Sequence, residues 1–163
     1  MNSIFNNMTN SFIALISVYL LVCLCDMMIT VPIISPLHSI IIVDKKTNKT
    51  REITDYKTEP IIITHQESFI VVFDIERLRS GNVRLERKIQ EMDDGSVYSI
   101  SISNKSVFPE KIRLKTAIDV PDYIKTGCKT LYTDSFYEYT YNVLTILNPI
   151  KVRIPSFDFC IKN

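Results

Sequence analysis

The chain has 163 residues, a length typical of one domain preceded by a short leader. Its 19 Lys and Arg residues nearly balance 18 Asp and Glu residues. This balance argues against a dedicated nucleic-acid binder, which needs excess cations to displace counterions from phosphates. Ile is abundant, whereas Ala is confined to Ala14 and Ala117, a usage that favours sheet because β-branched side chains pack well on a pleated surface.

The N-terminal 25 residues carry no charged side chain, and the first charge is Asp26. The apolar run from Phe12 to Cys25 is shorter than the roughly 20 residues that span a bilayer, and it is typical of a signal-peptide core. Cys23 and Cys25 are small enough for the positions that signal peptidase reads. We therefore expect residues 1–25 to be a signal peptide that is cleaved between Cys25 and Asp26.

The alternative is an uncleaved anchor that extends to about residue 34 and makes the membrane a partner. An aspartate such as Asp26 costs roughly 2.5–3.5 kcal/mol near the middle of a bilayer, which opposes this alternative. Pro32 also opposes a helix that continues through this stretch. The leader has no Lys or Arg, and Lys45 and Lys46 would favour an inward-facing domain if the helix were an anchor.

Two downstream features predict export to an extracellular setting. Asn48 and Asn104 begin N-glycosylation sequons, both in polar segments that we interpret as turns. Cys128 and Cys160 are the cysteines that remain after cleavage, so we expect them to form a disulfide. The alternative is a pair of free buried thiols.

Residues 36–163 read as a single domain of short apolar runs separated by polar turns. Strands are expected at 39–43, 60–64, 68–75, 96–103, 111–118, 136–147 and 150–154, and a final segment, 157–161, carries Cys160. The runs at 60–64 and 68–75 are apolar on both faces, as in central strands. Residues 83–92 fit either a strand or a helix; we expect a strand because Asp93-Asp94-Gly95 is a strong hairpin turn.

This pattern predicts an all-β fold, an antiparallel β-sandwich that follows the N-terminal signal or anchor segment. An immunoglobulin-like and a jelly-roll-like topology both remain open. The sequence has no Trp to pack on the disulfide, so the leading immunoglobulin hallmark is missing.

Tyr137, Tyr139 and Tyr141 are the candidate binding residues. They alternate along one predicted strand, and stacked tyrosines form contact patches of the kind found in protein interfaces. The alternative is a half-buried sheet face whose hydroxyls reach the rim of the core. A basic cluster that includes Arg77, Arg84 and Arg87 is interleaved with acids and is interpreted as a mixed solvated face.

No catalytic, phosphate-binding or metal motif is present, so we predict a non-enzymatic protein without a cofactor. The leading hypothesis is a secreted protein that binds another protein or a cell surface. A viral or parasite host-interaction factor is one form of it, because the residue usage is also typical of AT-rich genomes. The second hypothesis is an anchored structural envelope or surface protein. The third is a carrier of small hydrophobic ligands or an enzyme, which requires an apolar pocket with convergent polar groups.

Overall fold

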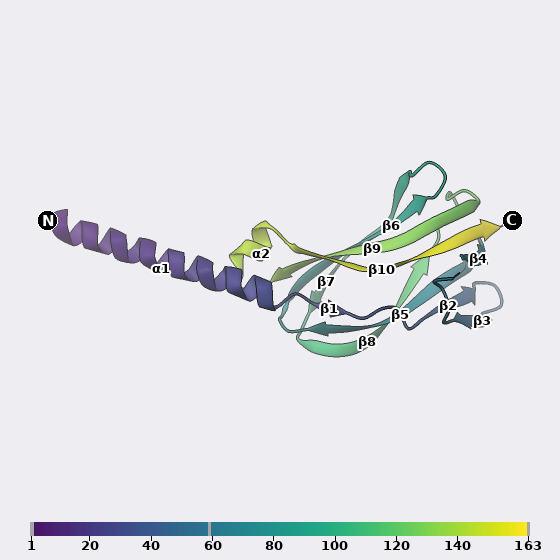
Figure 1. Ribbon diagram of the computed structural model, residues 1–163, viewed down its shortest axis with the longest axis horizontal. Coiled ribbons are helices and arrows are strands. Elements are labelled where there is room, and N and C mark those ends of the chain that lie inside the picture. Colours follow the sequence, from purple (N-terminus) through teal and green to yellow (C-terminus); the bar gives the residue numbers. More distant parts are fainter. Residues whose placement is uncertain (1, 59, 163) are drawn as a thin grey trace.

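The computed structural model describes residues 2–58 and 60–162, and it joins a long N-terminal helix to a β-sandwich (Figure 1). The long helix, α1 (Asn2–Ile29), projects away from one end of the sandwich. A short helix, α2 (Val143–Leu147), lies beside the C-terminal end of α1. The predicted all-β sandwich after an N-terminal apolar segment is therefore confirmed.

The sandwich has two five-stranded sheets. The first comprises β1 (Ile33–Ile34), β2 (Ser39–Asp44), β3 (Thr50–Ile53), β5 (Glu67–Arg77) and β8 (Glu110–Asp119). The second comprises, in spatial order, β4 (Ile61–Thr64), β10 (Ile150–Lys162), β9 (Gly127–Tyr139), β6 (Gly81–Glu91) and β7 (Val97–Val107). Neighbouring strands are antiparallel except for the parallel pair of β4 and β10.

The core forms where the apolar sides of the two sheets meet. β5 lies between β2 and β8, and its alternate residues from Phe69 to Ile75 are buried. The ring of Phe69 packs edge-on against Phe157 and Phe159 of the other sheet, with ring centroids 5.1 and 5.2 Å apart. Such edge-to-face contacts add to the stabilisation that burial of these large rings supplies.

The structure corrects four details of the predicted strands. Residues 83–91 are strand, as expected, and Met92 begins the turn, but Ile61–Thr64 form an edge strand instead of a central one. Asn104 lies within β7 and not in a turn, because the chain first turns after Val107. The strand predicted at 136–147 ends at Tyr139, since Asn142 begins helix α2. Residues 150–154 and 157–161 belong to one strand, β10, with a bulge between them.

The predicted disulfide is present between Cys128 of β9 and Cys160 of β10. The two residues are direct cross-strand partners, with Cα atoms 4.0 Å apart. The bond thus joins two adjacent strands of the second sheet at the end of the sandwich away from α1.

Replacing both Cys128 and Cys160 with Ala should lower the free energy of unfolding by about 3.5–4 kcal/mol on the chain-entropy model. The reason is that the bond restricts the unfolded chain between residues whose sequence separation is 32. Urea unfolding followed by circular dichroism measures this change. Cys25→Ala is the matched control, because Cys25 is a free, exposed cysteine and should leave the midpoint unchanged. An unchanged midpoint in the double variant would contradict the prediction.

Candidate functional site

The three candidate tyrosines do not share one exposed surface. Tyr137 and Tyr139 lie between the sheets and are 2% and 1% exposed, whereas Tyr141 lies beyond the end of β9 and is 89% exposed. Tyr141 has a φ of 66°, which breaks the strand alternation on which the prediction depended. Tyr137 and Tyr139 lack the exposure that a contact face requires. They are core residues, which corrects the prediction of an exposed patch of three tyrosines.

Asn142 joins the long helix to the sandwich, a role that its sequence context gave no sign of. Its side chain is 2% exposed, and Oδ1 accepts hydrogen bonds from the backbone N–H groups of Leu144 at 3.1 Å and Thr145 at 3.3 Å. Asn142 therefore caps α2. Its Nδ2 donates to the Cys23 carbonyl at 2.9 Å and to Asp26 Oδ2 at 3.1 Å. One buried amide thus ties the start of α2 to the last turns of α1.

Asp26 forms a second link between α1 and the sandwich. Its Oδ1 accepts from Nε of Arg79 at 3.0 Å and from Nη2 at 2.8 Å. Arg79 lies in the turn that follows β5. An exposed pair of this kind contributes little stability on its own. Its effect is to place a countercharge beside the one acidic residue of the apolar helix.

Tyr139 forms the third link. Its phenol donates to the carbonyl of Thr30, directly after α1, and its backbone N–H donates to Thr145 Oγ1 at 2.8 Å. Burial raises the pKa of the Tyr139 phenol to about 12. The phenol therefore stays protonated and remains a donor throughout the physiological pH range. Tyr139, one of the predicted binding residues, thus binds the backbone directly after α1.

The end of the sandwich nearest α1 is built from connections with few charges. We call this end the proximal rim; it comprises residues 78–80, 108–109 and 140–149. The register places these connections together, because Gly81 is opposite both Tyr139 and Val107. Arg79 is the one charged residue of the rim, and Leu78, Phe108 and Leu147 are exposed there. Connections at the opposite, distal rim contain Lys45, Lys46, Lys49, Asp93, Asp94, Asp122 and Lys125.

A cavity of about 290 Å³ lies between the sheets, bounded by β5 and β8 on one side and by β6, β7 and β9 on the other. Strand β7 lines this space with Lys105, Ser106 and Val107. Its register places Ser101 and Ser103 opposite Arg87 and Leu85, on the inward side, while Ile102 is 62% exposed.

Polar groups converge on this cavity. The buried atoms Arg77 Nε and Arg87 Nε have no hydrogen-bond partner within the described chain. Arg77 Nη2 pairs with Glu110 Oε1 at 2.5 Å. Arg87 donates to Ser101 Oγ at 3.3 Å and forms no ion pair with any described carboxylate. Burial lowers the pKa of the Arg87 guanidinium, as expected for a desolvated cation.

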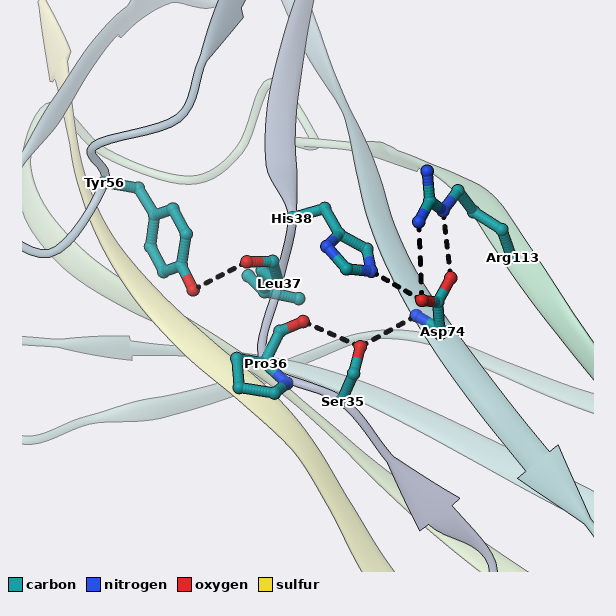
Figure 2. Close-up of polar contacts among 7 residues, drawn as sticks. All are labelled: Ser35, Pro36, Leu37, His38, Tyr56, Asp74 and Arg113. Atoms are coloured by element: carbon teal, nitrogen blue, oxygen red, sulfur yellow. Dashed lines mark hydrogen bonds and ion pairs between the residues drawn. The ribbon is translucent and has the colours of Figure 1, made fainter.

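A His–Asp–Arg cluster lies on the outer side of the first sheet (Figure 2). Asp74 accepts from Arg113 Nε at 2.9 Å and contacts His38 Nε2 at 2.8 Å. Ser35 Oγ bonds to the Asp74 backbone N–H at 2.9 Å and to the Pro36 carbonyl at 2.8 Å. Because these bonds direct Ser35 to the backbone and Asp74 to arginine, the cluster fastens the segment before β2 to β5. It does not form a serine nucleophile with a histidine base.

Strand alternation separates the basic residues around the β5–β6 turn. Arg77 and Arg87 line the cavity, Arg84 stacks on the Phe136 ring at 4.8 Å from its centroid, and Arg79 contacts α1. They do not form the single mixed face expected from the sequence. Among the described residues, no group of three His, Cys, Asp or Glu side chains is placed to hold a metal ion.

The two sequons lie on the surface of the sandwich. Asn48 is exposed in the β2–β3 turn, with a φ of 55°, and Asn104 is exposed on β7. Both asparagines are therefore sterically available, and their glycosylation stays a prediction.

No protein-family model matches this sequence, and a comparison with curated proteins finds no similar one. Function is therefore inferred from the residues and their geometry.

Tyr139→Ala should lower the free energy of unfolding by about 3–5 kcal/mol, the range for large-to-small core changes. The variant loses a buried ring together with its hydrogen bond to Thr30. Tyr141→Ala is the control and should have little effect, because the Tyr141 side chain is exposed. Thermal and urea unfolding measure both. Equal stability of Tyr139→Ala and the wild type would contradict the core assignment.

Asp74→Asn should make the protein less sensitive to acid. Hydrogen bonds from Arg113 and His38 lower the pKa of Asp74 from 3.8 to about 2. A folded-state pKa below the unfolded value stabilises the fold above about pH 4, and this contribution is lost as the pH falls towards 2. Acid unfolding followed by circular dichroism should show a shallower loss of stability in that window for the variant. Asp93→Asn, in an exposed turn, should retain the wild-type slope, and an identical slope for Asp74→Asn would refute the linkage.

Proposed function

We propose that this protein is a membrane-anchored surface protein, in which α1 spans the bilayer and holds the β-sandwich on its outer side. There the sandwich acts as a non-enzymatic binding module. The observation that carries the proposal is the bonding of Asn142 to Cys23 and Asp26. Cleavage after Cys25 would remove one acceptor of a buried amide, and a lost partner for a buried donor is costly. This bonding favours the anchor, the alternative from the sequence, over the cleaved signal preferred there, and cleavage stays a prediction.

The dimensions of α1 support a span. The segment Met8–Ile29 has 22 residues, and its most apolar stretch of 18 residues has a mean hydropathy of 2.5 and is hardly buried against the sandwich. At a rise of 1.5 Å per residue this length is about 33 Å, which matches a hydrocarbon core of about 30 Å. The apolar run that ended at Cys25 looked too short because Asp26 interrupted it.

Asp26 does not have the cost expected of a charge in mid-membrane. It lies one turn before the end of α1, where a spanning helix reaches the interface, and Arg79 pairs with it. Insertion costs of about 2.5–3.5 kcal/mol apply to unpaired charges at the helix centre. The pair therefore fits the boundary between bilayer and domain.

The proximal rim suits contact with lipid headgroups. Its connections carry one charge, already paired with α1, and they expose Leu78, Phe108 and Tyr141. Aromatic and apolar side chains of this kind favour the membrane interface. The distal rim, with its Lys and Asp residues, then faces away from the bilayer and is the surface open to a protein partner.

The disulfide and the two exposed sequons support placement of the sandwich on the non-cytoplasmic side. Under the positive-inside rule, Lys45 and Lys46 oppose this orientation. They lie in the distal rim, however, and β1 and β2 separate them from α1. Glycosylation of Asn48 or Asn104 reports directly on the side of the membrane where the sandwich lies, because it occurs on exported segments.

The proposal is tested by expressing the full chain with a C-terminal tag in cells that have a secretory pathway, followed by alkaline carbonate extraction. We expect the tagged protein in the membrane pellet, with a mobility shift on glycosidase treatment. Tagged protein in the medium would support the secreted alternative instead. A pellet fraction without glycan and with free thiols at Cys128 and Cys160 would show the opposite orientation.

Cys25→Leu is the matched control, since a large side chain before the cleavage position blocks signal peptidase. If α1 is an anchor, the variant and the wild type should distribute identically between pellet and medium. A wild type that is released while Cys25→Leu is retained would show that cleavage after Cys25 is the normal fate.

A further inference from the structure

The inter-sheet cavity has an excess of positive charge. The charged residues that line it are Arg77, Arg87, Lys105, Lys115 and Glu110, four cations against one carboxylate. Glu110 is already paired with Arg77. Arg87 is the half-buried cation that no described carboxylate neutralises. A desolvated guanidinium without a countercharge is unfavourable, and an anion that reached it would relieve this cost.

Both sides of the cavity combine polar and apolar groups. Arg87 of β6 and the fully buried Ser135 of β9 lie on one side, together with apolar residues of the same strands. The facing strands β5 and β8 contribute the apolar residues Val71, Phe73 and Leu114, and the Arg77–Glu110 pair lies where β5 ends and β8 begins. A ligand that fills this lining must itself have a polar and an apolar part.

We propose that this cavity binds a single-chain amphiphile with a compact anionic head, whose oxyanion pairs with Arg87 and whose alkyl chain packs against β5 and β8. The planar guanidinium offers two parallel N–H donors to a carboxylate. Arg77 Nε is a further unpartnered donor in the lining of the same cavity. The volume of about 290 Å³ lies at the lower end of the range for small-molecule pockets, which favours one chain over two.

The edge strands β7 and β8 of the two sheets both line the cavity, and Lys105 of β7 is exposed. An exposed cation at this position attracts the anionic head before it enters. The cavity lies wholly within the sandwich, so this inference does not depend on whether α1 is an anchor.

The test uses the full chain in phosphatidylcholine nanodiscs and a photoreactive analogue of dodecanoate whose diazirine lies near the end of the chain. After irradiation, cross-linked peptides are mapped by mass spectrometry. We expect labelled peptides from residues 67–77 and 110–119, which form β5 and β8. Excess dodecanoate should compete with this labelling, whereas dodecanol, which lacks the anionic head, should compete poorly.

Arg87→Gln should reduce labelling of these two strands by about tenfold, because a charge-assisted hydrogen bond is lost. Arg84→Gln is the matched control; Arg84 lies on the opposite side of the same strand, over the ring of Phe136, and its loss should leave labelling unchanged. Thr116→Trp places a large ring in the cavity at the edge strand β8 and should abolish labelling.

Melting temperatures establish whether each variant is folded. If Arg87→Gln does not fold, Thr116→Trp still provides a decisive test. Three results would each overturn the proposal: labelling confined to α1, equal competition by dodecanol, or wild-type labelling in a folded Arg87→Gln or Thr116→Trp variant. These readouts are separate from carbonate extraction, so a failure here leaves the anchor proposal to its own test.

Discussion

The arrangement of this molecule depends on one buried side-chain amide. Asn142 has two donors and two acceptor sites, and all four are used: the acceptors cap α2 and the donors bind Cys23 and Asp26 at the end of α1. Unpartnered buried polar groups are rare because each costs the loss of its hydrogen bonds with water. The amide therefore couples the position of the helix to the β9–β10 connection, and a sandwich without α1 would have to hydrate or rearrange this site.

The strands were largely predictable, whereas the junction was not. Alternation of apolar and polar residues gives the period of β2, β5 and β8 directly, since side chains of a strand point to opposite faces in turn. The junction instead depends on pairs distant in sequence, such as Asp26 with Arg79 and Cys23 with Asn142. No local pattern predicts such pairs. Asp26 therefore looked like the end of an apolar run, when it is a charge neutralised at the end of a longer helix.

The cavity was missed for a related reason. The alternating apolar and hydroxyl residues of 96–103 predict a strand, but alternation alone does not say which side faces inward. A bulge between Arg87 and Lys88 shifts the pairing of β6 with β7, and a one-residue shift exchanges the two faces. Ser101 and Ser103 therefore lie on the inward side of β7. Arg87 lies between the sheets because it alternates in step with Val83, Leu85 and Ile89 along β6, whose register with β9 is unbroken, although its sequence context suggested a solvated surface. Tyr137 and Tyr139 are buried for the same reason, because alternation alone did not say which side of their strand faces inward.

The central claim is that the N-terminal helix remains part of the folded protein. Intact-mass measurement of the mature protein purified from expressing cells, after removal of glycans, tests it most directly. We expect a mass that includes the whole of Phe12–Cys25. A mature chain that begins at Asp26 would contradict it, because Cys23 could then have no role in holding Asn142.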